Sequence, residues 1–362
     1  MSRLSGRRIV VAGAGAIGSV LALRLRAEDA EVLLADPAPL GANASGVAAG
    51  MLAPAFEAAL DPASAGHFDL LKTARDLWPE LAARVGGALD RSGALWVGDG
   101  ESNPDMLARL VRVGGHAERV APAAVHALSP GLRASVGAVF TPEDWTLDPD
   151  AMLAGLRHAF EAAGGTSRSA AVSSWSAGAA RMSDGTQAEA DALILAAGLA
   201  AEGLASPPEE LAALQPIKGQ IVSLQASGPR AGPVVRGEGV YVVPRGSGPI
   251  VGATMEAGVR DLTVDPVVVA SLASAAARLF PTLAGAPASG QAGVRASAPD
   301  GLPLVGESRT PGVWLAMGAR RNGWLLAPLI AEVLADQLAG GEGGPPAALF
   351  RPDRFPAGSI GQ

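Results

Sequence analysis

The chain has 362 residues, of which 49% are hydrophobic and 17% are charged, and its formal net charge is -7. A chain of this length predicts about two globular domains with a sizeable core, and the negative charge disfavours a nucleic-acid partner. Cysteine is absent, which excludes disulfides, thiolate metal sites, cysteine nucleophiles and a cysteine-linked cofactor, and is consistent with a cytoplasmic location.

The sequence predicts no integral membrane segment, because no stretch reaches about 18 consecutive apolar residues. We also expect no signal peptide, since Arg7 and Arg8 precede a glycine-rich unit rather than a continuous apolar run. No metal site is predicted, because the histidines lie outside every motif described below. These histidines are His67, His116, His126 and His158.

The first predicted unit is a βαβ motif at the amino terminus. A short apolar run ends in the pattern Gly-x-Gly-x-x-Gly, a helical pattern follows, and a second apolar run closes on Asp36. In the dinucleotide-binding fingerprint, Gly13 permits the tight turn, Gly15 lets the backbone approach a pyrophosphate, and Gly18 lets helix and strand pack closely. Asp36 would accept hydrogen bonds from a ribose. A tight turn without a ligand is the alternative, which the flanking strand, helix and acid disfavour.

Two further segments follow in the amino-terminal part. Residues 41–54 are small and uncharged, without a hydrophobic period. Small side chains would let backbone N–H groups approach a flat ligand, whereas the alternative, a linker, would normally carry more polar residues. From His67 to Arg84 the apolar residues recur at helical spacing, which predicts one helix.

The middle of the chain contains short strands without alternating crossover helices. This pattern predicts a mixed or antiparallel sheet in a second unit that is inserted into the first. The predicted strands are Gly93–Val97, Ala138–Thr141, Ile217–Leu224, Val234–Val235, Val240–Pro244 and Ile250–Ala253, and the predicted helices are Asp105–Gly114 and Pro266–Phe280.

The nucleotide-binding pattern returns twice. Asp150–Ala163 is predicted as a helix, Ala170–Trp175 as a strand, and residues 190–198 as a buried parallel strand that ends at Gly198. Near the carboxyl end, Trp314–Gly318 is predicted as a strand, followed by a long apolar helix. Ligands bind outside the carboxyl ends of such strands. The first unit is therefore predicted to be discontinuous in sequence.

Seven ordered sequence blocks can be compared with known families: GAGAIG (Gly13–Gly18), ASGVAAGMLAP (Ala44–Pro54), PIKGQIVSL (Pro216–Leu224), VYVVPR (Val240–Arg245), IVGATME (Ile250–Glu256), AGVRASAPDGLPLVG (Ala292–Gly306) and RNGWLLAP (Arg321–Pro328). Together these blocks resemble the glycine oxidase and D-amino-acid oxidase family of flavoproteins, and especially its glycine oxidases associated with thiamine biosynthesis. The resemblance extends from about Arg8 to Gln337.

The resemblance implies an α/β fold: a Rossmann-like FAD-binding domain of the glutathione-reductase type, with an inserted α+β substrate domain on a mixed or antiparallel sheet. The discontinuous FAD-binding domain would comprise residues 1–80, 145–215 and 290–362. The substrate domain would comprise residues 81–144 and 216–289. FAD would be bound non-covalently.

The resemblance also implies the cofactor contacts. It places the pyrophosphate near Ala16 and Ile17, the ribose at Asp36, and a backbone group of Val172 toward the adenine. The helix that follows Asn322 would point its N-terminus at the flavin, where it would stabilise the negative charge of the reduced ring. The predicted cofactor-binding residues are Gly13, Gly15, Ala16, Ile17, Gly18, Asp36, Ala44, Ser45, Ala49, Gly50, Met51, Val172, Gly198, Gly318, Arg320, Arg321, Asn322, Gly323, Trp324 and Leu325.

Three residues are predicted as catalytic and substrate-binding residues. By resemblance, Arg295 grips the substrate carboxylate, for which a planar guanidinium is well suited, and Tyr241 caps the same group. The alternatives are a surface arginine and a core tyrosine. Because Arg320 and Arg321 are adjacent, we expect one of them to point inward, and we choose Arg321. The chain departs from the family at Gly239 and within the Gly318–Gly323 segment, at Ala319, where related sequences carry histidines.

The implied activity is oxidative deamination of glycine or a small amino acid. In this family, hydride passes from the substrate Cα to flavin N5, the imine hydrolyses to a keto acid and ammonia, and O₂ is reduced to hydrogen peroxide. The resemblance assigns no catalytic base to any of the blocks. The alternatives are a D-amino-acid dehydrogenase, a sarcosine-, proline- or hydroxyproline-type oxidase, an NAD(P)-dependent dehydrogenase and a non-enzymatic flavin-binding protein. Family members are commonly homo-oligomers.

Overall fold

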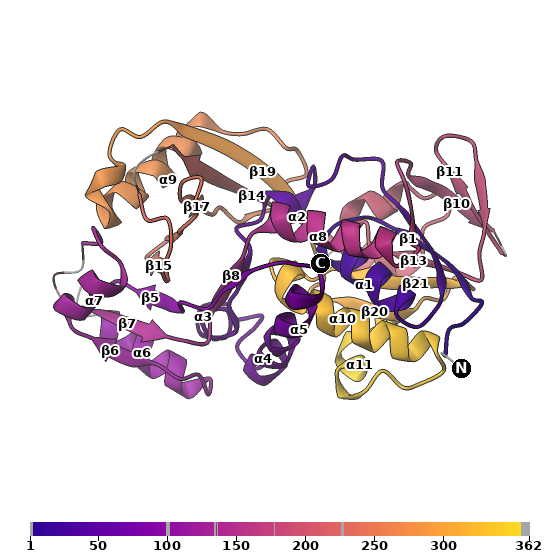
Figure 1. Ribbon diagram of the computed structural model, residues 1–362, viewed down its shortest axis with the longest axis horizontal. Helices are drawn as coiled ribbons and strands as arrows, with labels where there is room; N and C mark the ends of the chain where they lie inside the picture. Colours follow the sequence, from indigo (N-terminus) through magenta and orange to yellow (C-terminus); the bar gives the residue numbers. More distant parts are fainter. Residues whose placement is uncertain are drawn as a thin grey trace.

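The chain folds into two groups of elements that are built on different sheets (Figure 1). The groups lie at opposite ends of the long axis, and α2 (Ala44–Val47) and β8 (Trp145–Leu147) lie between them. The predicted α/β fold with an inserted mixed sheet is therefore confirmed. The computed structural model describes residues 3–98, 102–133, 135, 137–176, 178–225 and 228–355.

A parallel sheet forms the centre of the first group, with the strand order β20-β21-β13-β1-β2-β9. Strands β1, β2, β9, β13 and β21 run parallel, and β20 is an antiparallel edge strand. Burial on both faces accounts for the nearly continuous apolar sequence of β1 and β13. The strands are β1 (Arg8–Ala12), β2 (Glu31–Ala35), β9 (Thr166–Arg168), β13 (Ala192–Leu195), β20 (Leu304–Glu307) and β21 (Val313–Met317).

Helices cover this sheet, and α1 packs against both α8 and α10. The side chain of Asp148 caps α8, since its Oδ1 accepts a hydrogen bond from Ala151 N at 3.1 Å. The buried apolar side chains of α1, α8 and α10 belong to one core cluster. The elements are α1 (Ala16–Arg26), α8 (Pro149–Ala162), α10 (Gly323–Leu338), α11 (Pro345–Phe350), η1 (Gly198–Gly203), η2 (Glu209–Ala213) and η4 (Pro352–Arg354).

The second group is built on a large mixed sheet with the order β18-β14-β17-β16-β15-β5-β7-β6, and β19 also pairs with β14. Most neighbours are antiparallel, but β15 and β5 pair in parallel. The strands are β5 (Ala94–Trp96), β6 (Glu118–Val120), β7 (Ala138–Thr141), β14 (Gln215–Leu224), β15 (Val234–Gly237), β16 (Val240–Val243), β17 (Ile250–Gly252), β18 (Glu256–Ala257) and β19 (Ala288–Ser297).

The remaining elements are short strands and helices. Two small antiparallel sheets have the orders β3-β8-β4 and β10-β11-β12. Their strands are β3 (Met51–Leu52), β4 (Leu89–Asp90), β10 (Val172–Ser176), β11 (Ala179–Met182) and β12 (Gln187–Glu189). The helices are α3 (Pro54–Leu60), α4 (Phe68–Asp76), α5 (Trp78–Arg84), α6 (Ser102–Arg112), α7 (Pro122–Leu128), α9 (Pro266–Leu279) and η3 (Pro281–Leu283).

One element prediction was wrong. The apolar period from His67 to Arg84 predicted one helix, but the structure has two, α4 and α5, which meet at Leu77. The cause is Pro79, which has no N–H to continue a helical ladder and is favoured in a first helical turn.

The predicted domain division remains a prediction. Its boundary at residue 290 falls inside β19, which pairs with β14 along its whole length. Parts of the predicted domains lie outside the described residues, namely 1–2, 99–101, 134, 136, 177, 226–227 and 356–362. Of the helices that the structure describes, none is both long enough and apolar enough to span a membrane.

Candidate active site

The glycine-rich turn joins β1 to α1. At each of its glycines, either the backbone conformation or the lack of space disfavours a side chain. Gly13 has a φ of 108°, in the left-handed region that favours glycine. A Cβ on Gly18 would lie 1.9 Å from the carbonyl oxygen of Gly13, so a side chain there would force the helix away from the turn. A Cβ on Gly15 would lie 2.9 Å from the Ser45 hydroxyl, which accepts a hydrogen bond from Ala16 N at 2.9 Å.

Asp36 directly follows β2 and faces the same turn. Its Oδ2 accepts a hydrogen bond from Ala14 N at 2.7 Å, and its Oδ1 accepts one from Ala38 N at 2.9 Å. Each carboxylate oxygen can accept a second hydrogen bond. The geometry is therefore compatible with the predicted ribose contact, which remains a prediction.

A cavity of about 630 Å³ extends from Asp36 past the carboxyl ends of β1 and β13 to the start of α10. This volume lies within the usual range of small-molecule and cofactor sites, about 300–1,000 Å³. We call it the cofactor cavity. Its lining includes these predicted cofactor residues: Gly13, Gly15, Ala16, Ile17, Asp36, Ala44, Ser45, Gly198, Gly318, Arg320, Arg321, Gly323 and Trp324.

The other predicted cofactor residues lie elsewhere. Four of them, Ala49, Gly50, Met51 and Asn322, border a second cavity, described next. Three border neither cavity. Gly18 packs against the turn, Leu325 is buried in the core, and Val172 packs against the cluster beneath the parallel sheet. The cofactor roles of all these residues remain predictions.

The second cavity, of about 310 Å³, adjoins the first and lies against the large mixed sheet; we call it the substrate cavity. Arg295, Arg321 and Trp324 border both cavities. Strand pairing places five lining residues side by side across β14, β17, β16, β15 and β5, so they share one face of the sheet. These residues are Ile221, Gly252, Tyr241, Arg236 and Trp96.

Two of the three predicted substrate residues, Arg295 and Tyr241, border this cavity and influence each other's charge. Burial raises the pKa of the Tyr241 hydroxyl, and the positive charge of Arg295 opposes that shift. Burial lowers the pKa of Arg295. Within the described ranges Arg295 has no carboxylate partner; its Nη1 lies 3.6 Å from Met255 Sδ. A partly buried guanidinium without an anionic partner is well placed to bind one.

Gly219 makes room for Arg295. A Cβ on Gly219 would lie 2.1 Å from Nη1 of Arg295. We expect Gly219→Ala to move the guanidinium while the fold stays intact, because the clash involves the end of a flexible side chain. The expected result is a loss of roughly 10- to 100-fold in kcat/KM for a small amino acid, the substrate class that the sequence resemblance predicts, measured by steady-state kinetics, since small misplacements have effects of this size. Gly246→Ala, where a Cβ meets nothing within 4 Å, is the control and should change kcat/KM little.

The adjacent Arg320 and Arg321 both face the cofactor cavity, so the expectation that only one would point inward was wrong. Arg320 has a φ of 51°, which breaks the usual alternation of neighbouring side chains. Its guanidinium pairs with Asp61. Nε of Arg321 lies 2.5 Å from Oε2 of Glu57 and 3.4 Å from Oδ2 of Asp61. Arg321 alone of this arginine pair also borders the substrate cavity.

Sequence reasoning missed Glu57, Asp61, Arg236 and Trp96. Glu57 and Arg236 are buried, and Oε1 of Glu57 lies 3.8 Å from Nη2 of Arg236. One available signal was a pair of acids four residues apart, Glu57 and Asp61, in an otherwise apolar segment. Another was a charged residue, Arg236, in an apolar strand. Within the described residues no group of three or more His, Asp or Glu side chains is arranged to hold a metal ion.

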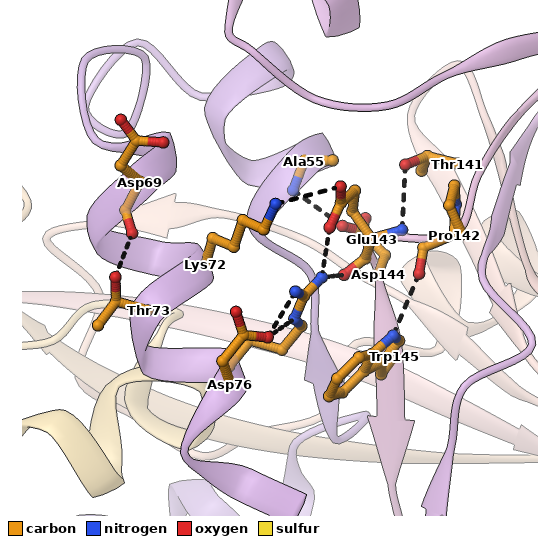
Figure 2. A network of polar contacts seen from close by, with 11 residues as sticks. Ala55, Asp69, Lys72, Thr73, Asp76, Thr141, Pro142, Glu143, Asp144 and Trp145 are labelled. Atoms are coloured by element: carbon orange, nitrogen blue, oxygen red, sulfur yellow. Dashed lines mark hydrogen bonds and ion pairs between the residues drawn. The ribbon is translucent and has the colours of Figure 1, made fainter.

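Asp144 fixes the start of α3, the helix that carries Glu57 (Figure 2). Its Oδ1 accepts a hydrogen bond from Ala55 N at 2.8 Å, and its Oδ2 accepts one from Phe56 N at 3.3 Å. The neighbouring Glu143 pairs with Arg75, whose Nη1 lies 2.6 Å from Oε2 of Glu143. Burial raises the pKa of Asp144 to about 7.

This shift predicts a pH-dependent stability. Because the pKa of Asp144 is higher in the folded state than the unfolded value of about 3.9, folding favours its protonated form. This group's contribution to stability should therefore fall as pH rises from about 4 to about 7. We expect the Tm of Asp144→Asn, relative to the unsubstituted protein, to be higher at pH 8 than at pH 5, measured by thermal unfolding. A Tm difference between the two proteins that is the same at pH 5 and pH 8 would contradict the raised pKa of Asp144.

The parallel sheet, its glycine-rich turn and the cavity along its carboxyl edge define a dinucleotide-binding protein of the Rossmann type. The adjoining substrate cavity leaves room for a second molecule beside the cofactor cavity. A model of the DAO family, described as FAD dependent oxidoreductase, matches residues 8–337. The chain therefore belongs to the DAO family of FAD-dependent oxidoreductases, and the predictions of this family and of FAD as cofactor are confirmed.

Individual relatives cover most of the chain. A glycine oxidase of Pseudomonas putida is 29% identical over 93% of this chain and 95% of its own length. The bifunctional protein ThiO/ThiG of Trichormus variabilis is 29% identical over 96% of this chain, which spans only 55% of that longer protein. The crystal structure of glycine oxidase from Geobacillus kaustophilus superposes with a TM-score of 0.83 at 26% identity, covering 97% of this chain and 100% of that one.

Proposed function

We propose that this protein is an FAD-dependent oxidase of glycine or another small amino acid. The observation that carries the proposal is the pair Arg295 and Tyr241, which border a cavity that adjoins the cofactor cavity. The relatives named glycine oxidase support the same substrate class. A role in thiamine biosynthesis, a cytoplasmic location and a homo-oligomeric state, each expected from the sequence, are further parts of the proposal.

The protein's own groups would bind and orient the substrate. The guanidinium of Arg295 suits a bidentate pair with the substrate carboxylate. Because its pKa is raised, the Tyr241 hydroxyl stays protonated and can donate to the same carboxylate. Arg321, held by Glu57 and Asp61, would close the side shared by the two cavities. Fixing the carboxylate in this way directs the Cα–H bond toward the cofactor cavity.

When bound, FAD would accept a hydride, with its two electrons, from Cα and would pass these electrons on to O₂. The amine must be neutral at this step. Hydrolysis of the product imine then gives a keto acid and ammonia. With glycine, the balanced reaction consumes one O₂ and one water and yields glyoxylate, ammonia and hydrogen peroxide.

The test is a stoichiometric assay of the purified yellow protein with glycine in air. We expect hydrogen peroxide, glyoxylate and ammonia in equal amounts. Dye reduction without oxygen, in the absence of peroxide formation in air, would instead indicate a dehydrogenase. A protein that takes up no FAD, or that binds FAD and oxidises no amino acid of a panel containing glycine, sarcosine and small D- and L-amino acids, would overturn the proposal.

A further inference from the structure

Two side chains of the second group of elements lie at the opening of the cofactor cavity. Arg260 and Leu262 belong to the segment between β18 and α9, residues 258–265, and both border this cavity. Both are also largely exposed: the side chain of Arg260 is 54% exposed, and Leu262 is 64% exposed. Residues that border a cavity and also face solvent lie at its opening. Residues 258–265, which we call the rim segment, therefore form one edge of that opening.

The rim segment is fixed to β14 at two places. Nζ of Lys218 lies 2.8 Å from Oδ1 of Asp261, and the backbone N–H of Asp265 donates a hydrogen bond to Oε1 of Gln220 at 2.7 Å. Lys218 is buried, and a buried ammonium group needs such a partner. Arg260 directly precedes Asp261, so its side chain projects from a backbone that is held in place.

An ion pair joins the rim segment to the first group of elements. Nη1 of Arg260 lies 2.6 Å from Oε2 of Glu202, and Nη2 of Arg260 lies 3.2 Å from Oε1, so the contact is bidentate. Glu202 belongs to η1, whose residues 198–200 border the same cavity. The pair therefore connects an edge of the cavity supplied by the second group with an edge supplied by the first.

This position concerns the cofactor rather than the substrate. Neither Arg260 nor Glu202 borders the substrate cavity. Exposed ion pairs contribute little to the stability of a fold, so the effect of this pair should be local. A dinucleotide in the cofactor cavity would leave more readily if the two edges could separate, and the pair holds them together.

We propose that Arg260 and Glu202 form a latch across the opening of the cofactor cavity, and that this latch slows the release of FAD. Neither residue lies in the sequence blocks or among the predicted cofactor-binding residues. The latch depends on FAD binding, which membership of the family establishes, and not on the substrate. It can therefore fail while the proposed function stands. Because salt screens exposed charges, the latch should weaken as the ionic strength rises.

The experiment measures the rate of FAD release from the holoenzyme without substrate, as the loss of protein-bound flavin absorbance while charcoal removes free FAD. At about 0.01 M salt, we expect Arg260→Met and Glu202→Gln each to release FAD about two- to fivefold faster than the unsubstituted protein, since exposed ion pairs have effects of this size. At about 1 M salt, where the Debye length is about 3 Å, the three rates should converge.

Arg309→Met is the matched control, because Arg309 forms a comparably exposed pair with Glu209 that borders neither cavity. Its release rate should equal that of the unsubstituted protein. Arg260→Glu alone sets two carboxylates face to face and should release FAD fastest, whereas adding Glu202→Arg to it should restore slow release.

Three results would overturn the latch. The first is an unchanged release rate in both Arg260→Met and Glu202→Gln. The second is faster release in Arg260→Met alone, which would mean that Arg260 contacts FAD itself. The third is an exchanged pair that releases FAD as fast as Arg260→Glu. A protein that takes up no FAD would defeat the proposed function as well, whereas normal amino-acid oxidation with any of these three results would defeat the latch alone.

Discussion

Arg295→Met is expected to lower kcat/KM for the amino acid by at least about 30-fold. The substitution removes the guanidinium that would pair with the substrate carboxylate, and truncating one partner of a buried, hydrogen-bonded charge pair costs about 2–5 kcal/mol. At about 1.4 kcal/mol per factor of ten, the lower limit corresponds to this loss. Most of the effect should appear in KM, because the carboxylate is bound in the ground state as well as in the transition state. Steady-state kinetics with glycine measures it.

The control for this variant is Arg351→Met. The side chain of Arg351 is 63% exposed and pairs with Asp353 at the surface, so its replacement should leave KM within about twofold, in keeping with the small contribution of surface ion pairs. Spectra of both variants should show the same flavin content. If Arg295→Met had the kinetic constants of the unsubstituted protein, the carboxylate would have to bind elsewhere.

Gly18→Ala is expected to weaken FAD retention by tenfold or more. The added Cβ would lie 1.9 Å from the Gly13 carbonyl oxygen, a backbone atom that cannot rotate away, so the start of α1 must move from the turn. Overpacking of this kind costs about 1–3 kcal/mol, and the displacement also moves the helix N-terminus that would face the pyrophosphate. The measurement is the flavin-to-protein absorbance ratio after dialysis, together with a titration of the apoprotein with FAD.

Gly203→Ala is the matched control for Gly18→Ala. A Cβ on Gly203 meets nothing within 4 Å, so the same chemical change should leave FAD affinity unchanged. Equal flavin content in the two variants would show that close packing of α1 against the turn is not needed for cofactor retention.

Much of the fold could be predicted because local patterns specified it. The βαβ unit was predictable, since apolar runs, glycines and Asp36 all follow one another closely in sequence. The strand Ala138–Thr141 has the predicted bounds. The break between α4 and α5 was not anticipated, because the apolar period continues across Leu77 and the effect of Pro79 on the backbone was not weighed.

The candidate site was predictable only in part. Arg295 and Tyr241 lie in sequence blocks with a family resemblance, and the structure places both at one cavity. Arg236 and Trp96 come from strands far apart in sequence, and only the parallel pairing of β15 with β5 brings them together. Local periodicity carries no information about such pairings. Glu57 was missed for a similar reason, because its approach to Arg321 depends on how α3 packs beneath the turn that precedes α10.

The parallel pair β15–β5 has a consequence for biosynthesis. β5 leaves the ribosome long before its partner, so its edge stays unpaired while the intervening chain is made, and exposed strand edges favour aggregation. Pairing β5 with β15 also closes a long loop of intervening chain, and such closure is slow. Low expression temperature or co-expressed chaperones should therefore raise the yield of native protein, and a truncated chain that ends before Val234 should be poorly soluble.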